Sequence, residues 1–118
     1  TAIDMNTGEH LWWIPNGDTP ARIRNHPALQ GIDLPNTGQS SHATALVTQS
    51  LLMYGEGRGG EARFHAVDKR TGEEVGTVDL PGTTDTAPMT FMHEGRQYIV
   101  TAVSGPGLPG SLVALRLP

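Results

Sequence analysis

The residues of this chain that could do chemistry are mostly isolated polar groups beside glycine-containing turns. Asp4, Asn6 and Gly8 begin like a calcium loop, in which a glycine turn brings several oxygen ligands together. The glutamate that closes such a loop is missing, because Pro15 stands in its place. We therefore interpret these residues as a turn whose side chains cap its own backbone amides.

A second candidate is the glycine-rich segment 55–60, which satisfies the GxGxxG pattern of dinucleotide-binding loops. That pattern holds a pyrophosphate only where it opens a helix. The residues that follow alternate with the period of a strand, through Ala62, Phe64 and Ala66. The segment is therefore predicted to be a flexible loop between two strands rather than a phosphate site.

The histidines and serines give no catalytic or metal-binding pattern. Histidines stand at positions 10, 26, 42, 65 and 93, never at the i, i+4 spacing of a helical metal pair. Ser40 or Ser41 could be combined with His42 and an aspartate as a hydrolase triad. The GxSxG elbow of such enzymes is missing, however, and neighbouring residues of a strand point to opposite faces. No catalytic residue and no metal ligand is assigned. His42 remains of interest because it precedes a predicted innermost strand.

Composition narrows the class of protein. The net charge of −4 with a single lysine leaves no basic stripe for phosphates, so nucleic acid is not expected as a partner. No stretch approaches the ~20 apolar residues of a membrane span, and the absence of cysteine excludes disulfides and thiolate sites. Fifteen glycines and nine prolines favour an all-β fold rich in turns. Because the first residue is Thr1, the chain is expected to be a fragment or a processed product.

An internal repeat organises the chain. Residues 2–9 and 66–73 both read AxDxxTGE, with the two aspartates, Asp4 and Asp68, 64 positions apart. Arg70 replaces the Asn6 of the first copy, which supports a turn rather than a cation site in both. A repeat unit usually buries its apolar face on a neighbouring unit, so the function is expected to belong to an array larger than 118 residues.

Apolar runs separated by turn residues predict strands along most of the chain. We expect two strands within residues 1–14, then a long connection over residues 15–41 with at most a short helical turn. A meander follows, with strands at 43–47, 51–54, 62–67 and 75–80. The last strands are predicted at 88–92, 97–103 and 112–117, with a turn at 93–95 and a loop over 104–110.

The spacing of these strands predicts a β-propeller. Ala66 and Ala114 are 48 residues apart, a spacing in the range of four-stranded blades. The 16 residues by which the 64-residue spacing exceeds 48 are absorbed by the long connection. The chain then divides into the last two strands of one blade (1–14), a long inter-blade connection (15–41), a complete four-stranded blade (42–81) and the first three strands of a final blade (82–118). The missing strand would come from the beginning of the full polypeptide.

Three segments carry a resemblance to a known family. The AxDxxTGExxW pattern of residues 2–12 resembles the tryptophan-docking repeat of the eight-bladed quinoprotein dehydrogenases, which use pyrroloquinoline quinone (PQQ); the second copy has Gly76 in place of the tryptophan. Residues 86–92 with 95–100 resemble a segment near the C-terminus of PQQ-dependent alcohol and glucose dehydrogenases. Residues 51–57 with 68–69 resemble the preceding blade of the glucose dehydrogenase branch.

The resemblance implies that PQQ and Ca²⁺ serve the full-length protein, with a catalytic aspartate upstream of this chain. We do not assign the role of the catalytic aspartate to Asp4 or Asp68. Trp12 is expected to pack between blades. Turns that lead into innermost strands would form one part of the cofactor pocket. The predicted cofactor-side residues are Gln39, Ser40, Ser41, His42, Thr84, Asp85 and Thr86.

The chain therefore looks like the C-terminal part of a PQQ-dependent dehydrogenase that oxidises a sugar or alcohol by hydride transfer to the quinone and passes electrons to a quinone or cytochrome. The resemblance implies a periplasmic enzyme, with any membrane attachment made through a region outside this chain. The isolated chain is expected to be inactive and to self-associate through open sheet edges. Two alternatives stay open: a noncatalytic PQQ-like propeller that binds proteins, and a β domain that serves only as a scaffold.

Overall fold

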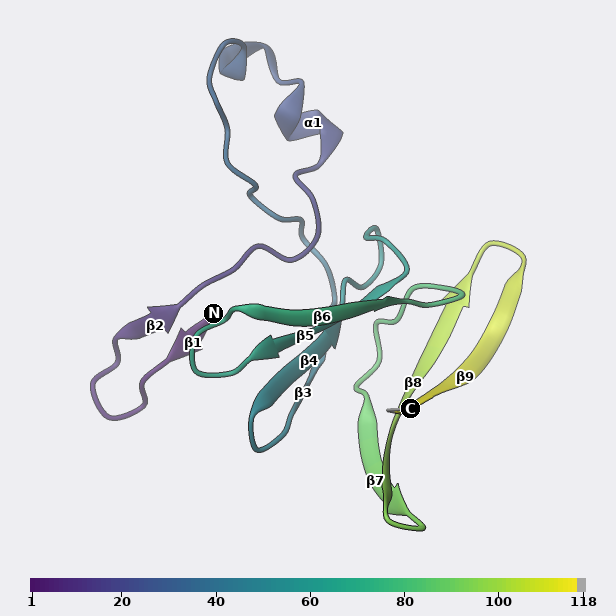
Figure 1. The fold of residues 1–118 in the computed structure, drawn as a ribbon. Helices are drawn as coiled ribbons and strands as arrows, with labels where there is room; N and C mark the ends of the chain where they lie inside the picture. Colours follow the sequence, from purple (N-terminus) through teal and green to yellow (C-terminus); the bar gives the residue numbers. More distant parts are fainter. Residues whose placement is uncertain (117–118) are drawn as a thin grey trace.

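The computed structural model describes residues 1–116 and consists of three antiparallel sheets (Figure 1). The first sheet pairs β1 (Ala2–Ile3) with β2 (His10–Trp12). The second has the order β3-β4-β5-β6, with bounds Ala45–Val47, Leu51–Gly55, Arg63–Asp68 and Glu74–Asp79. The third has the order β7-β8-β9, with bounds Met89–His93, Arg96–Gly105 and Leu108–Arg116. The all-β expectation is confirmed.

The middle of the connection over residues 15–41 stands away from the sheets (Figure 1), while its two ends contact the β4–β5 loop. It contains α1 (Ala21–Arg24) and the 3₁₀ helix η1 (Pro27–Leu29), so it holds two short helical segments where at most one turn was expected. Pro20 precedes the first and Pro27 opens the second, a place where proline is tolerated because the first amides of a helix have no internal partner. No helix among residues 1–116 is long and apolar enough to cross a membrane.

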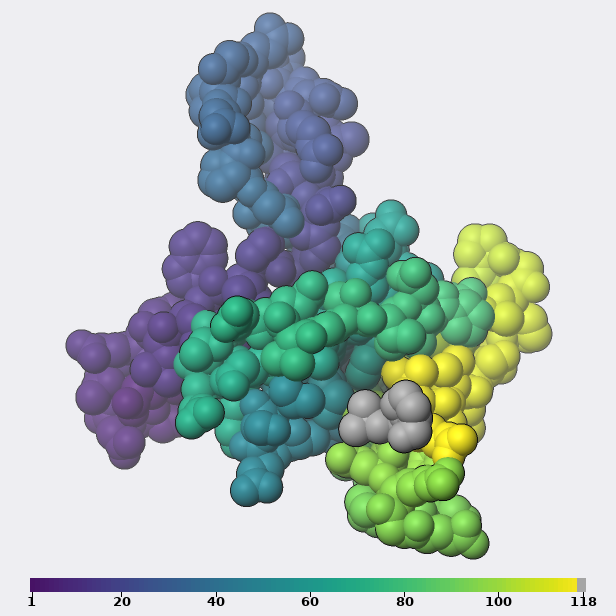
Figure 2. All heavy atoms as spheres, viewed as in Figure 1, coloured from purple at the N-terminus to yellow at the C-terminus, as the bar shows by residue number. Residues whose placement is uncertain are grey.

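The sheets form an open body rather than a closed globule (Figure 2), and its principal extents of 55 × 45 × 22 Å make it flat. The radius of gyration is 16.1 Å, against about 13.5 Å for a compact domain of this length. The accessible surface is 8237 Å², whereas a compact protein of this mass exposes roughly 6200 Å². The buried apolar cluster is small and lies between the second and third sheets, with Met53, Phe64, Leu80 and Val103 at its centre. This shape is that of a sector that lacks its neighbours.

The two copies of the repeat fold into the same turn, bond for bond. In the first, the Asn6 amide donates to Asp4 Oδ1 at 2.8 Å and the Gly8 amide donates to the Asp4 carbonyl at 2.7 Å. In the second, the Arg70 and Gly72 amides make the corresponding bonds to Asp68, both at 2.8 Å. Both glycines have positive φ, 76° and 75°. The predicted self-capped turn is confirmed in both places.

Trp12 packs against the next sheet, as predicted. Its indole Nε1 donates to the Lys69 carbonyl at 3.1 Å. A methyl group on Gly72 would lie 2.7 Å from the indole ring, so the glycine leaves room for the ring to rest on the turn backbone. The turn therefore connects one sheet to the next through a single aromatic side chain.

The junction between the second and third sheets lacks this contact. A Cβ atom on Gly76 would meet nothing within 4 Å. A groove of about 410 Å³ opens here, lined by apolar residues that include Met53, Phe64, Ile99 and Leu115. Packing at this junction therefore rests on the buried cluster rather than on a docked tryptophan.

The loop predicted over residues 104–110 is wrong. β8 continues to Gly105 and β9 begins at Leu108, so the turn is confined to Pro106 and Gly107, whose φ is 75°. Pro109 and Gly110 lie within β9 at a register irregularity, since Val103 pairs with Ser111 and Gly105 with Leu108. A bulge of this kind accommodates a proline because the ladder of hydrogen bonds is already interrupted there.

The docking of Trp12 gives a first prediction, to be tested in the full-length protein. Replacing Trp12 with alanine should reduce the free energy of unfolding by about 2–4 kcal/mol, because both apolar contact and a hydrogen bond are lost. Trp13→Ala is the matched control, since Trp13 is 72% exposed and its removal should change stability by less than about 0.5 kcal/mol. Chemical denaturation measures both. Equal effects of the two variants would contradict the docking role.

The two turn glycines form a second matched pair. Gly8→Ala should reduce the free energy of unfolding by about 1–2 kcal/mol, because alanine is strained at positive φ but has open space there. Gly72→Ala should reduce the free energy of unfolding by about 1–3 kcal/mol more than Gly8→Ala does, because the new methyl group meets the Trp12 ring. In a Trp12→Ala background this excess should disappear, and denaturation of the double variant checks it. Persistence of the excess would show that it has another origin.

Candidate functional site

One end of the second sheet gathers the segments that carry the predicted site residues. β3 and β5 begin at this end and β4 and β6 finish there, because neighbouring strands are antiparallel. We call it the site end; the opposite end, which carries the turn at residues 68–73, is the turn end. The segments that meet at the site end are residues 37–44, the β4–β5 loop at 56–62, and the connection at 80–88.

Gln39 is bound to the start of the long connection, at Asn16, and to the β4–β5 loop. Its backbone amide donates to the Asn16 carbonyl at 2.9 Å. With the side-chain amide oriented to satisfy its surroundings, Nε2 donates to the Gly59 carbonyl at 2.7 Å and Oε1 accepts from the Gly60 amide at 2.9 Å. A side chain at position 60 would collide with the Gln39 amide, so this contact requires glycine.

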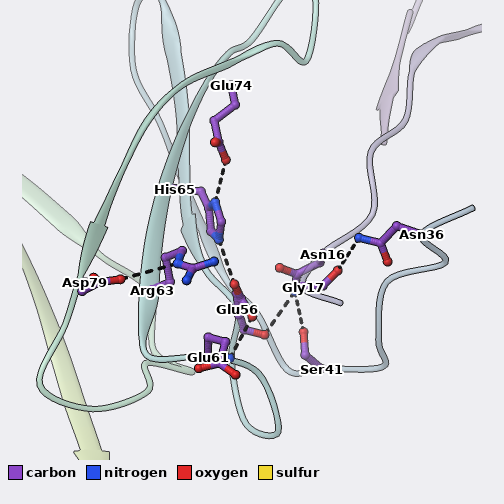
Figure 3. Close-up of polar contacts among 10 residues, drawn as sticks. All are labelled: Asn16, Gly17, Asn36, Ser41, Glu56, Glu61, Arg63, His65, Glu74 and Asp79. Atoms are coloured by element: carbon purple, nitrogen blue, oxygen red, sulfur yellow. Dashed lines mark hydrogen bonds and ion pairs between the residues drawn. The ribbon is translucent and has the colours of Figure 1, made fainter. Parts of the chain in front are cut away.

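Ser41 is held through Asn16. The Asn16 Nδ2 atom donates to Ser41 Oγ at 2.7 Å and to the Glu56 carbonyl at 3.1 Å (Figure 3). Asn16 Oδ1 is buried and has no hydrogen-bond partner among the described residues. A buried acceptor of this kind calls for a donor, and a bound ligand or a water molecule would supply one.

The second predicted cluster is attached to the third sheet. Thr84 is 3% exposed, and its hydroxyl lies 2.6 Å from that of Thr101 on β8. Thr86 Oγ1 donates to the Ala102 carbonyl at 3.5 Å. Asp85 faces the β4–β5 loop, where Arg58 lies 3.8 Å from its carboxylate in an exposed ion pair. Thr84 therefore fixes the segment, whereas Asp85 and Thr86 reach its surface.

The structure attaches Gln39, Ser41 and Asp85 to the β4–β5 loop, Gln39 and Asp85 directly and Ser41 through Asn16. Ser40 and His42 are exposed beside them. That these residues contact a cofactor stays a prediction.

Sequence reasoning missed an acidic residue at the centre of this arrangement. Glu56 is 3% exposed, accepts from the Glu61 amide at 2.8 Å and lies 3.1 Å from His65 Nε2. His65 Nδ1 lies 2.9 Å from Glu74 on β6 (Figure 3). The available signal was a carboxylate between Gly55 and Gly57 at a strand end, in a segment interpreted as a plain loop.

Tyr54 completes this cluster. Its ring stacks on the His65 ring with centroids 5.2 Å apart and an interplanar angle of 17°. Burial raises the pKa of the Tyr54 phenol above its usual value, and the nearby carboxylates of Glu74 and Glu56 add to the increase. The phenol therefore stays neutral at physiological pH.

Residues 1–116 contain no group of three histidine, cysteine, aspartate or glutamate side chains placed to hold a metal ion. Both carboxylate oxygens of Glu56 are already engaged, by Glu61 and His65. The site end instead presents hydroxyl, amide and guanidinium donors, which suit a ligand rich in oxygen or negative charge.

Comparisons with known proteins place this chain in a family. A family model described as the PQQ β-propeller domain of glucose, ethanol and alcohol dehydrogenases matches residues 1–99. The glycerol dehydrogenase large subunits of Gluconobacter thailandicus and Gluconobacter oxydans (strain 621H) are 33% and 31% identical to the chain over 107 residues. Each alignment covers 89% of this chain and 14% of the relative. No solved structure matches the chain.

The propeller expected from strand spacing is confirmed at the level of the family, while the assignment of blades to residue ranges stays a prediction. The three antiparallel sheets, their open faces and the docked tryptophan agree with a part of such a ring. The chain belongs to the family of PQQ β-propeller domains of glucose, ethanol and alcohol dehydrogenases.

Proposed function

We propose that this chain is a C-terminal sector of a PQQ-dependent dehydrogenase that oxidises the hydroxyl group of a sugar or alcohol. The observation that carries the proposal is the family match over residues 1–99. The convergence of Gln39, Ser41 and Asp85 on one loop supports a ligand-facing role for the site end. The names of the relatives make a polyol such as glycerol one candidate substrate.

The residues at the site end fit one side of a PQQ pocket. PQQ is a planar quinone with three carboxylates, and when bound it accepts the hydride of the substrate. Ser40 and His42 would donate hydrogen bonds to its oxygens from exposed positions. Thr86 would do the same by exchanging its long hydrogen bond to the Ala102 carbonyl, 3.5 Å, for one to the ligand. Arg58 would offset the negative charge of Asp85, which otherwise repels an anionic ligand. The catalytic base and the calcium ligands would come from outside this chain.

The remaining expectations for the whole enzyme are part of the same proposal. Electrons would pass to a quinone or a cytochrome, and the enzyme would work in the periplasm, with any membrane attachment supplied by another region. The family resemblance supports these points.

The proposal predicts that residues at the site end affect PQQ binding. In the full-length protein, His42→Ala and Thr86→Val should each raise the Kd for PQQ about 3–10-fold, as expected for one lost hydrogen bond. Arg70→Ala is the control, because Arg70 is an exposed residue at the turn end. Titration with PQQ followed by fluorescence measures the Kd, and dye reduction with glucose, ethanol and glycerol tests the activity.

Two outcomes would contradict the proposal. Failure of the unaltered protein to bind PQQ would favour the noncatalytic propeller that binds proteins. PQQ binding that Arg70→Ala weakens as much as His42→Ala would remove the site end from the cofactor pocket.

We also propose that the 118-residue chain self-associates when isolated. The uncovered face of the third sheet bears large apolar side chains, with Met89, Phe91 and Leu112 exposed by 56%, 42% and 77%. The period of two and the register of β7, β8 and β9 place Met89 and Phe91 on one face, and unpaired backbone edges add to the tendency to associate.

Light scattering coupled to size exclusion should show oligomers of the isolated chain at micromolar concentration. Leu112→Lys should shift the population toward monomer, because a charge on an apolar contact face opposes association. Thr71→Lys, which places the same charge at an exposed turn, is the control. A compact monomer at all concentrations would overturn the prediction.

A further inference from the structure

The β4–β5 loop is the common support of the predicted cofactor-side residues. Gly59 and Gly60 hold the Gln39 amide, the Glu56 carbonyl holds Asn16, and Asn16 in turn holds Ser41. Arg58 of the same loop pairs with Asp85. A change in this loop would therefore displace residues of both predicted clusters.

The loop itself is fixed by the carboxylate of Glu56. One oxygen, Oε2, accepts from the Glu61 amide and closes the loop on itself at 2.8 Å. The other, Oε1, faces His65 Nε2 at 3.1 Å (Figure 3). Because Glu56 is 3% exposed, its charge is not compensated by water and depends on these partners.

The contacts of His65 require one proton more than a neutral imidazole carries. A carboxylate only accepts hydrogen bonds, and a neutral imidazole donates from one nitrogen only. His65 has a carboxylate oxygen at each nitrogen, Glu56 at 3.1 Å and Glu74 at 2.9 Å. For both contacts to be hydrogen bonds, the three groups must share a second proton, either as an imidazolium or as one carboxylic acid.

Among the groups that surround His65, the shared proton supplies the positive charge that compensates the Glu56 carboxylate. Tyr54 stacks on the imidazole and is a neutral phenol. Arg63, the next residue on that face of β5, lies 3.5 Å from Asp79 of β6. The His65 side chain is 11% exposed and that of Glu74 is 55% exposed, so Glu74 links the buried pair to solvent.

We propose that this shared proton fixes the β4–β5 loop and thereby positions Gln39, Ser41 and Asp85 for the cofactor. His65 and Glu56 are positioning residues, and Glu74 is the exposed group that stabilises the protonated state. The proposal of a cofactor-facing role rests on the proposed function; the proton-dependent loop does not.

The direction of the pH effect follows from the proton count. Imidazole changes its charge between about pH 5 and 8. While the extra proton is present, both contacts are hydrogen bonds. Without it one carboxylate loses its donor; we assign the loss to Nδ1, because water can replace that donor at the exposed Glu74. Glu56 then accepts from a neutral ring instead of an imidazolium, a weaker contact, so we expect the loop to loosen as the pH rises.

Amide hydrogen exchange in the apo form of the full-length protein tests the loop directly. Exchange of residues 56–61, corrected for the intrinsic effect of pH on the rate, should be slow at pH 6 and about tenfold faster at pH 8. Glu74→Gln should move this transition to lower pH, because the exposed negative partner is lost. Glu73→Gln is the matched control, since the adjacent Glu73 is also exposed and makes no contact with His65 among those described.

PQQ titrations across the same pH range test the link to the cofactor. The Kd should rise about tenfold from pH 6 to pH 8 in the unaltered protein, and the rise should begin at lower pH in Glu74→Gln but not in Glu73→Gln. Because Glu74 is exposed, this variant should fold even where His65→Gln does not.

The outcomes separate the two proposals. Loop exchange that shows no transition, or that responds equally to Glu74→Gln and Glu73→Gln, would overturn the proton switch. A loop transition with an unchanged Kd would overturn its role in positioning the cofactor-side residues. A loop transition without any PQQ binding would support the switch and overturn the proposed function.

Discussion

Each sheet of this chain has apolar side chains on both faces, so each face has to be covered by a neighbour. Trp12 docks on the second sheet at its turn end, the third sheet packs against the other face, and two of the four buried cluster residues, Met53 and Phe64, belong to the second sheet. The third sheet is covered on one side only, and its other face carries exposed Phe91 and Leu112. The excess accessible surface of the chain and its flat shape follow from this constraint, which a closed ring satisfies and a sector does not.

The docked tryptophan and the turn glycine contact each other, and among the described residues this pair occurs once, as Trp12 and Gly72. Trp12 rests on the turn at Gly72, where any side chain would occupy the place of the ring. At the next junction Gly76 replaces the tryptophan. In the second sheet Asp68, which begins the turn, pairs with Leu51. In the third sheet Arg116 has the corresponding position and pairs with Tyr98. The aspartate that begins the turn is therefore also replaced. A lost tryptophan and a changed turn position thus coincide at the junction that has the open groove.

Local chemistry made much of the fold predictable from the sequence. The AxDxxTGE turns follow from hydrogen bonds within six residues, and their geometry is the same in both copies. The loop expected at residues 104–110 is wrong because Pro109 and Gly110 are accommodated at a register irregularity between β8 and β9, and the register between strands is a tertiary property. The cluster of Glu56, His65 and Glu74 was not predictable for the same reason. Its members become neighbours through the pairing of β4, β5 and β6, and no spacing along the chain indicates it.

The two ends of the second sheet are held by different kinds of contact, and this difference bears on function. The turn end is closed by backbone hydrogen bonds and an aromatic ring, neither of which titrates near neutral pH. The site end is held by side chains, and its central carboxylate is buried beside a histidine. Stability can therefore stay constant at the turn end while the site end responds to protons. A sheet held in this way can stay docked to its neighbour through the turn end while the loops at the site end adjust.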